Sequence, residues 1–328
     1  MFPLYNGAKF LKKNLDSIKL LKNLNEIELV IVDNKSKDSS IDIIESYEKE
    51  INIKLIKNDI NKGFAEACNT AAKISKGKYI FITNQDVIFP SDIFIRLKKI
   101  YNNLKNDLEI VISPALIFEN GTIHYFGAKI HFLGFSYTPE LGEKLPKKRI
   151  IKKTERFSGG GSFMKKDFFL EMGGFDESFF MYYEDTDLSL KMLRIGHKIY
   201  TTNDTFLIHQ KNYQTLNDSQ YFFLERNRFI VLVKNFDNIR KLIPFIIIIE
   251  IILLFHSILI RKFKLRIKIY IDILSKIKYL ENLRERSKKE SSLLSYKNLS
   301  KKLDPILLWK LRNVNGLRRL LKILNIIL

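Results

Sequence analysis

Short apolar runs alternate with helix-like segments through the first 118 residues. The apolar runs are IELVIVDN (27–34), INIKLIKN (51–58), GKYIFITNQD (77–86) and EIVISPALIF (109–118). Between them lie SSIDIIESYEKE (39–50), GFAEACNTAAKIS (63–75) and SDIFIRLKKIYNNL (91–104), which have the spacing or composition of helices. An apolar run bounded by polar residues is typical of a buried parallel strand. The alternation therefore predicts an α/β fold with a mostly parallel central sheet and helices on both faces.

The first residues fit this pattern incompletely. The segment LYNGAKFLKKNLDSI (4–18) has the pattern of a loop and helix that follow a strand, yet only Met1 to Leu4 are available for that strand. Either the sheet lacks most of its first strand, or the true start of the protein lies upstream. We favour the second interpretation and treat the first strand as truncated.

The pattern is weaker from residue 121 to 156, where GTIHYFGAKI and HFLGFSYTPE predict a hairpin or an irregular insertion. A glycine-rich stretch, a short helix and a turn follow, in ERFSGGGSFMKKDFFLEMGGFDESFF (155–180). The next residues, MYYEDTDLSLKM (181–192), predict a helix to about Ile195, and HKIYTT (197–202) predicts a strand. The acids of that helix start raise a question, because buried carboxylates are costly unless they are paired, metal-bound or used.

The chain changes character after Asn235. Residues 242–260, LIPFIIIIEIILLFHSILI, form a nearly apolar run that could just span a bilayer, although Glu250 makes a clean span less comfortable. Downstream, residues 261–280 and 304–328 alternate basic and apolar residues, as amphipathic helices on an anionic membrane surface do. We therefore expect a catalytic domain over 1–235 and a helical membrane-association region over 236–328, attached peripherally or by a single pass. An ordinary helical subdomain or a dimer interface is the alternative.

Charge and cysteine content add to this picture. The 328 residues carry a net charge of +20. From Arg261 to Leu328 there are 19 Lys+Arg and five Asp+Glu, a balance of +14, so most of the positive charge belongs to the tail. A basic tail suggests an anionic partner, either nucleic acid or lipid headgroups. The single cysteine, Cys68, rules out an internal disulfide and indicates a reducing compartment, and the N-terminus lacks the pattern of a signal peptide.

Polar residues recur where the predicted strands end. Asp33 and Asn34 follow one strand, Asn84 to Asp86 follow another, and Glu184 with Asp185 follows the aromatic run. Ligands in parallel α/β sheets bind beyond these strand ends. Asp86 with His209 could hold a divalent cation, and Asp185 could act as a general base. Each residue alone also fits a turn, a packed histidine or a helix start.

The order and spacing of these blocks resemble the family-2 inverting glycosyltransferases, in particular their bacterial rhamnosyltransferase-like branch. The match runs through YNG, ELVIVDNKSKDSS, IKNDINKGFAEACNTAAKISKGKYIFITNQDV, GGGSFMKKDFFLEMGGFDESFFMYYEDTDLSLKMLRIGHKIY, IHQKN and ERNRFIVLVKN. It covers about Leu4 to Asn235. The blocks NxGFAxxxN, NxD and GGFDExFFMYYEDxDL are the most specific parts. The resemblance implies the GT-A fold, that of the nucleotide-diphosphosugar transferases.

The resemblance also implies donor-binding residues. Asp33 matches the acid that binds the pyrimidine base, Leu4 and Tyr5 match the loop against the nucleotide, and the NKGF segment covers it through Asn61, Gly63 and Phe64. Asn84, Gln85 and Asp86 match the DxD-type motif, with Asn84 in place of the first acid, which leaves Asp86 as the main carboxylate ligand of Mg²⁺ or Mn²⁺. His209 matches the later metal ligand. Arg226 is a further candidate contact to the diphosphate.

On the acceptor side, Asp185 matches the catalytic base, and Glu184 is expected to orient the acceptor. Gly159, Gly160 and Gly161 match the floor under the donor sugar and acceptor, and Tyr183 belongs to the aromatic acceptor platform. The resemblance thus implies transfer of a sugar, with rhamnose as one candidate, from a nucleoside diphosphate to a glycan or lipid-linked glycan. The expected place is the cytoplasmic face of the cell membrane, in surface-polysaccharide synthesis.

Two other classes of function remain open. A protein of this fold could hold a nucleotide sugar without turnover, although the intact acid set argues against a non-catalytic copy. A nucleic-acid binder would fit the charge, but the basic residues alternate with long Ile and Leu runs and form no nucleic-acid module. The donor sugar, the acceptor, the linkage and the oligomeric state do not follow from the sequence.

Overall fold

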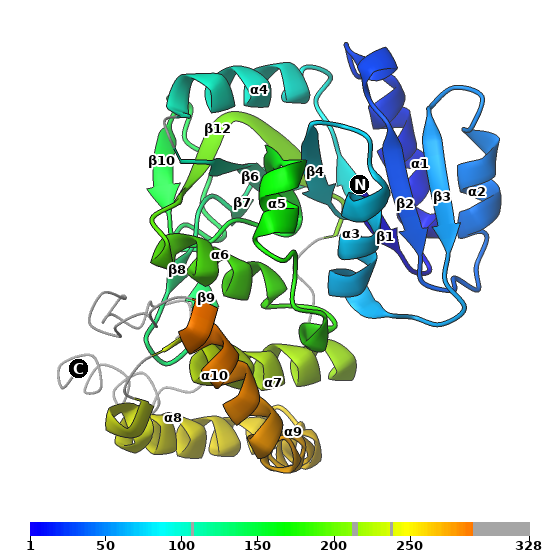
Figure 1. Cartoon of the computed structure of the whole chain (residues 1–328). Helices are drawn as coiled ribbons and strands as arrows, with labels where there is room; N and C mark the ends of the chain where they lie inside the picture. Colours follow the sequence, from blue (N-terminus) through cyan, green and yellow to red (C-terminus); the bar gives the residue numbers. More distant parts are fainter. Residues whose placement is uncertain (106–107, 212–215, 237–238, 291–328) are drawn as a thin grey trace. The chain divides into compact units, whose positions relative to one another are not determined.

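This computed structural model describes residues 1–105, 108–211, 216–236 and 239–290 (Figure 1). Its contacts divide the chain into two compact units. The first unit comprises residues 1–127 and 140–214, and the second comprises 128–139 and 215–328. The helix that precedes residue 235 therefore groups with the C-terminal helices. The functional boundary expected at 235 stays a prediction.

The first sheet of the first unit is parallel throughout. Its order is β1-β2-β3, with Phe2 opposite Ile31 and Leu29 opposite Ile53. The strands are β1 (Phe2–Leu4), β2 (Leu29–Asp33) and β3 (Ile53–Lys57), and the helical segments between and after them are α1 (Ala8–Lys19), η1 (Leu24–Glu26), α2 (Ser40–Ser46) and α3 (Gly63–Ile74). The predicted alternation of strands and helices is confirmed here, although β1 contains only three residues.

The second sheet is mixed, in the order β10-β12-β6-β11-β4, with β5 beside β12 and β7 beside β6. Only β6 and β12 pair in parallel. The strands are β4 (Tyr79–Thr83), β5 (Val87–Ile88), β6 (Ile110–Phe118), β7 (Ile123–Tyr125), β10 (Ile151–Thr154), β11 (Gly161–Lys165) and β12 (Lys198–His209). The helical segments are α4 (Ile93–Leu104), α5 (Lys166–Glu171), η2 (Glu177–Phe179) and α6 (Glu184–Arg194). The glycine-rich stretch thus supplies β11, a strand that its sequence pattern did not indicate.

Met1 joins the two sheets. Its ammonium group donates to the Phe81 carbonyl at 2.8 Å, and the Thr83 N–H donates to the Met1 carbonyl at 3.1 Å. This alternation of bonds is that of a parallel pair, so β1 and β4 run in the same direction. Strand β11 runs antiparallel to both β4 and β6, which gives β6 and β12 that direction as well. The carboxyl ends of β1, β2, β4 and β12 therefore lie along one edge.

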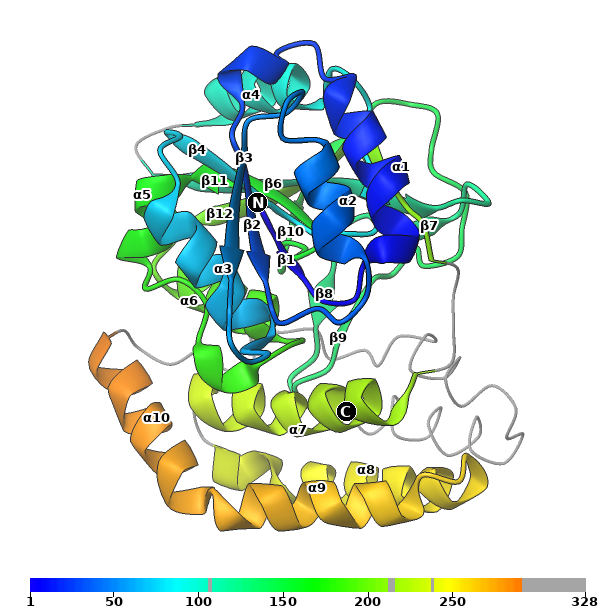
Figure 2. The same cartoon turned by 90° about the vertical axis from the view of Figure 1, so that its right-hand side faces the viewer.

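One face of the joined sheets packs against α3, α5 and α6. Alternate strand residues such as Val30, Val32, Ile80 and Ile82 form a buried cluster with side chains from these helices. The helix α3 contributes small residues to the cluster, namely Ala65, Ala67, Cys68, Ala71 and Ala72. Small side chains let a helix axis approach a sheet closely, and α3 lies directly over β1 and β2 (Figure 2).

The second unit is mainly helical. It contains the hairpin β8 (Lys129–Ile130) and β9 (Ser136–Tyr137) and the helices α7 (Asp218–Asn235), α8 (Ile239–Leu259), α9 (Phe263–Ser275) and α10 (Ile277–Glu290). Among the described residues, α8 is the one helix that is long and apolar enough to cross a membrane. It begins three residues before the predicted apolar run and includes Pro244. The amphipathic segment predicted over 304–328 lies outside the described residues.

Candidate active site

The loop after β2 holds Asp33 in a fixed orientation. Its side chain is buried, and both carboxylate oxygens accept from the Ser36 N–H, at 3.2 and 3.1 Å. The Ser36 hydroxyl in turn accepts from the Asn6 N–H at 2.9 Å. The loop after β1 is therefore fastened to the loop after β2, at the edge where ligands bind in this class of sheet.

Tyr5 stands at the same edge, with 46% of its surface exposed. Gln85, just after β4, forms two hydrogen bonds with the backbone of Tyr5. The Tyr5 N–H donates to Gln85 Oε1 at 2.9 Å, and Gln85 Nε2 donates to the Tyr5 carbonyl at 3.2 Å. Gln85 thus positions an aromatic ring that is free to stack on a planar ligand.

Asn34 holds the segment that contains Asn61 and Gly63. Its Nδ2 donates to the Gly63 carbonyl at 3.0 Å, and its Oδ1 accepts from Asn58 Nδ2 at 3.0 Å. Asn61 Oδ1 accepts from the Gly63 N–H at 2.9 Å. Sequence reasoning placed Asn34 at the strand end but gave it no role. Its structural role depends on a segment that begins 24 residues later.

The start of α3 is bound to the aromatic loop before α6. The Phe180 carbonyl accepts from the N–H groups of Phe64 and Ala65, at 2.6 and 3.2 Å. Phe180, Tyr182 and Tyr183 have positive φ angles of 64°, 67° and 71°. Such angles are unfavourable for side chains of this size, and they gather where the surrounding structure imposes them, often at functional sites.

Glu184 and Asp185 begin α6 directly after this loop, and both are buried. Asp185 Oδ2 pairs with Arg156 Nη1 at 2.5 Å and accepts from the Gly159 N–H at 3.1 Å. Its Oδ1 accepts from the Thr186 hydroxyl at 3.2 Å. The Asp185 carboxylate is thus held in place by a cation and two hydrogen-bond donors. Arg156 was not predicted. Its one signal in the sequence is its position just before FSGGG.

Glu184 has a different environment. Burial, and then the neighbouring Asp185, raise its pKa to about 8. Its Oε2 has no hydrogen-bond partner within the part of the chain that the structure describes. Glu184 is therefore protonated at neutral pH, and its carboxyl can donate a hydrogen bond. Adjacent acids with such different surroundings are suited to different roles in one reaction.

The glycines of the predicted floor lie between these acids and β4. A Cβ on Gly159 would come within 3.4 Å of Glu184 Oε1, and one on Gly160 within 3.1 Å of Asn84 Nδ2. The Thr83 hydroxyl donates to the Gly160 carbonyl at 3.1 Å. Gly161 begins β11 opposite Thr83. Asn84 and the acid pair are thus brought to the same glycine turn.

The structure brings Asp86 and His209 close together. Asp86 Oδ1 is 3.6 Å from His209 Nε2 and has no hydrogen-bond partner among the described residues. Asp86 Oδ2 pairs with Lys211 Nζ at 2.8 Å. His209 Nδ1 lies 3.1 Å from the Lys211 carbonyl, a contact that fixes the ring with Nε2 toward Asp86. His124 packs on that ring with centroids 4.8 Å apart, and burial, then His209 and Arg156, lower its pKa to about 3.

These two residues fit a divalent cation that takes its other ligands from a substrate. The buried, unpartnered Asp86 oxygen and the oriented imidazole are both suitable donors. No cluster of three or more His, Cys, Asp and Glu side chains that could hold a metal occurs in the described ranges. An oxygen-rich ligand such as a diphosphate would have to complete the coordination. Lys211, a residue that sequence reasoning missed, adds a positive charge at the same point.

Comparison with known proteins decides the family. The family model described as "Glycosyl transferase family 2" matches residues 1–173. The chain belongs to glycosyl transferase family 2. Among curated proteins, the family-2 chain is 26% identical to the uncharacterized glycosyltransferase EpsJ of Bacillus subtilis over 67% of its length and 62% of EpsJ. It is 21% identical to the O-antigen chain rhamnosyltransferase RfbN of Salmonella typhimurium, over 68% of its length and 69% of RfbN.

Other relatives match over shorter stretches. The chain is 31% identical to the poly(ribitol-phosphate) beta-glucosyltransferase of Bacillus spizizenii over 34% of its own length, and that match spans only 18% of the relative. The family-2 chain thus covers less than two thirds of the length of this relative and of EpsJ.

Solved structures confirm the GT-A fold. The chain matches GalNAc-T7, crystallised with UDP, GalNAc and Mn²⁺, with a TM-score of 0.56, 15% identity and coverage of 72% of this chain and 47% of that one. It matches the mannosyltransferase PcManGT of Pyrobaculum calidifontis, in complex with GDP-Man and Mn²⁺, with a TM-score of 0.51, 17% identity and coverage of 70% and 61%. At these identities the likeness shows the fold alone.

Two predicted donor residues of the family-2 chain have surroundings that do not by themselves indicate donor binding. Leu4 is fully buried in β1, so only its backbone and the neighbouring Tyr5 face the loops. Arg226 belongs to α7 in the second unit, where its guanidinium lies 4.9 Å from the centre of the Phe223 ring. The donor roles of both residues stay predictions.

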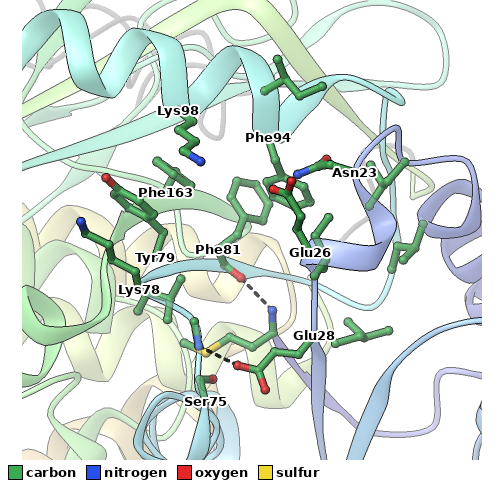
Figure 3. A pocket seen from close by; sticks show the side chains of 18 of the residues that line it. Asn23, Glu26, Glu28, Ser75, Lys78, Tyr79, Phe81, Phe94, Lys98 and Phe163 are labelled. Carbon is green, nitrogen blue, oxygen red and sulfur yellow. Dashed lines mark hydrogen bonds between the residues drawn. The ribbon is translucent and has the colours of Figure 1, made fainter.

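A cavity of about 900 Å³ lies at the opposite end of the strands (Figure 3). Its lining includes Leu29 and Val30 at the start of β2 and Tyr79 and Ile80 at the start of β4. Asp33 and Asp86 follow the other ends of these two strands. The lining includes neither these two acids nor Glu184 and Asp185, although Thr83 belongs to both the cavity and the candidate active site.

Replacing Gly63 tests the connection between α3 and the aromatic loop. Gly63 has φ +84°, and an added Cβ would lie 2.4 Å from the Phe180 carbonyl oxygen. Gly142 has the same φ and nothing within 4 Å of an added Cβ, so it is the matched control. Both Ala variants carry about 1–2 kcal/mol of left-handed strain. Gly63→Ala adds an overpacking cost of about 1–3 kcal/mol. Urea unfolding should show this difference, and equal losses would contradict the contact.

The pKa of Glu184 predicts a pH dependence of stability. The unfolded carboxyl loses its proton near pH 4.5, whereas the folded one keeps it to about pH 8. Between these two pH values the native state keeps a proton on Glu184 that the unfolded state has lost. The free energy of unfolding therefore falls as pH rises through this range. We expect wild-type protein to lose at least about 1 kcal/mol more than Glu184→Gln between pH 5 and pH 8. Urea unfolding at both values measures this, and parallel pH profiles would contradict the protonated state.

Proposed function

We propose that the protein is a divalent-metal-dependent, inverting glycosyltransferase. It moves a sugar from a nucleoside diphosphate to a hydroxyl of a glycan or lipid-linked glycan in cell-surface polysaccharide synthesis. The observation that carries this proposal is the Asp185 carboxylate, held by Arg156 and the Gly159 N–H beside the glycine turn. The enzyme acts at the cytoplasmic face of the membrane.

Donor binding is assigned to the exposed strand edge. The Tyr5 ring and the oriented Asp33 carboxylate suit a planar base with N–H donors. Asp86 and His209 would hold the metal, and Lys211 would contact the diphosphate. A bound Mg²⁺ or Mn²⁺ would neutralise the charge that develops on the leaving diphosphate. PcManGT, with GDP-Man and Mn²⁺, and GalNAc-T7, with UDP and Mn²⁺, support this class of donor. RfbN supports rhamnose as one candidate sugar.

The acceptor reaction is assigned to the acid pair. Asp185 removes the proton of the attacking hydroxyl, and attack from the face opposite the diphosphate inverts the anomeric centre. Arg156 and the Gly159 N–H hold its carboxylate in place before the acceptor binds. Glu184, protonated at neutral pH, donates a hydrogen bond to an acceptor oxygen and thereby orients it. The same first-turn acids also suit the positive end of the α6 dipole, so both interpretations of this motif hold together.

A donor panel tests the reaction class. Purified full-length protein is given UDP-, dTDP- and GDP-sugars with Mg²⁺ or Mn²⁺, and released nucleoside diphosphate is measured with and without a lipid-linked acceptor. We expect release with one donor, lost after EDTA treatment and in Asp86→Ala. If calorimetry shows that a donor binds but no nucleoside diphosphate is released in the presence of acceptor, the protein would instead be a non-catalytic nucleotide-sugar-binding protein.

Asp185→Asn tests the assignment of the base. With the donor that the panel identifies, we expect kcat to fall about 10²–10⁴-fold, because the amide cannot accept the proton. Donor binding, measured by calorimetry, should stay within a few-fold of wild type. Glu184→Gln keeps a hydrogen-bond donor and serves as the control, with a smaller loss that appears mainly in the KM for acceptor. Retained kcat in Asp185→Asn would refute the assignment.

A further inference from the structure

The helix α8 exposes one apolar side along its whole length. Ile243, Ile247, Ile251, Phe255 and Leu259 follow one another at intervals of four residues, and all are exposed. Residues four apart are neighbours on a helix surface and are offset by about 40°, so this row winds gradually along α8. The opposite side, which includes Leu242, Ile249, Leu253 and Ser257, is buried within the second unit. One side of α8 thus packs on protein, and from Ile243 onward its exposed residues are apolar.

The next helix also exposes an apolar stripe. On α9 the exposed apolar residues are Phe263, Ile267, Ile271 and Leu274, which again share one face, and α9 packs against α8. Basic side chains border both stripes and are exposed as well, namely Arg240, Lys241, Arg261, Lys264 and Lys268. A wide apolar stripe bordered by cations is the pattern of a helix that lies in the boundary between lipid headgroups and acyl chains.

An ion-pair cluster fixes the buried side of α8. Glu250, near the middle of the helix, pairs with Arg228 of α7 and with Arg266 of α9, the latter at 2.8 Å. Arg266 also pairs with Glu225 of α7 at 2.6 Å, and the Tyr270 hydroxyl donates to Glu250 at 2.9 Å. Both arginines are fully buried. Removing one partner from a buried cluster leaves uncompensated charge, so the three helices move as one body.

This cluster is incompatible with a helix that crosses the bilayer. If α8 spanned the membrane, Glu250 would sit near the bilayer centre and would bring two arginines of neighbouring helices with it. Charged groups at that depth are strongly disfavoured. With α8 in the membrane plane, the cluster stays on the side that faces protein. The exposed half-surface can then be buried without breaking an ion pair.

We propose that α8 and α9 together form a monotopic docking surface for an anionic lipid bilayer, with both ends of α8 on the same side of the membrane. The apolar stripes enter the headgroup–acyl boundary, and the bordering cations contact acidic headgroups. The proposal rests on the membrane association proposed above and not on the transfer reaction. It chooses between the peripheral and single-pass arrangements that the sequence left open.

Vesicle flotation tests the surface. Full-length protein is mixed with vesicles of phosphatidylcholine alone or with phosphatidylglycerol added. We expect binding that is stronger with the acidic lipid and that falls at least tenfold in Phe255→Asp. Leu20→Asp is the control, because Leu20 is 72% exposed in the first unit and Phe255 is 62% exposed. Equal binding of the two variants to vesicles would overturn the proposal. It would also be overturned if wild-type protein did not bind vesicles and instead formed a concentration-dependent dimer that Phe255→Asp abolishes.

Cysteine labelling tests the orientation. The native Cys68 is fully buried, so single cysteines at Lys241→Cys and Arg261→Cys give a clean signal at the two ends of α8. In sealed inside-out membrane vesicles, an impermeant maleimide should label both sites. If the maleimide labels only one site, and labels the other only after detergent is added, α8 spans the membrane and the proposal is wrong. Nucleoside diphosphate release without vesicles should be unchanged in Phe255→Asp, so failure of docking and failure of transfer are separable.

Discussion

The Phe180 carbonyl is the point on which the candidate active site depends. It accepts from the first N–H groups of α3, and Gly63 leaves the space in which it lies. The contact joins the loop after β3 to the aromatic loop that leads into α6. Three residues of that loop hold left-handed angles, at a cost on the order of 1–3 kcal/mol each. The packed contacts around them offset this cost, and the result is that Glu184 and Asp185 emerge at a defined place.

The two neighbouring acids at the start of α6 have different surroundings. Asp185 reaches a buried guanidinium and a backbone N–H, whereas Glu184 meets burial and the charge of Asp185. A single helix turn therefore presents two neighbouring carboxyls with different partners. Burial and then Asp185 raise the pKa of Glu184, whereas Arg156 pairs with Asp185. The proposed metal site has a comparable arrangement, in which Lys211 pairs with Asp86 and its carbonyl lies against His209 Nδ1.

Much of this could be predicted from local pattern. The apolar runs gave the positions of β2, β3, β4 and β6, and their polar ends brought Asp33, Asn84 and Asp86 to one edge because parallel strands share a direction. Pairing between distant segments could not be predicted. Arg156 meets Asp185 only because β11 inserts between β4 and β6, and the GGGSFMK sequence of that strand resembles a loop. From the sequence, Glu250 interrupts an apolar run without an evident partner. Its partners Arg228 and Arg266 lie on two other helices, so the sequence pattern could not reveal them.

The stereochemistry of the product is the most direct test of the account. The proposed mechanism has one carboxylate base on the acceptor side and the diphosphate leaving from the opposite face, so that transfer would be a single displacement. The anomeric configuration of the product, read from the one-bond carbon–proton coupling by NMR, should be the inverse of that in the donor. Retention of the donor's configuration would require two displacements, and it would contradict the role given to Asp185.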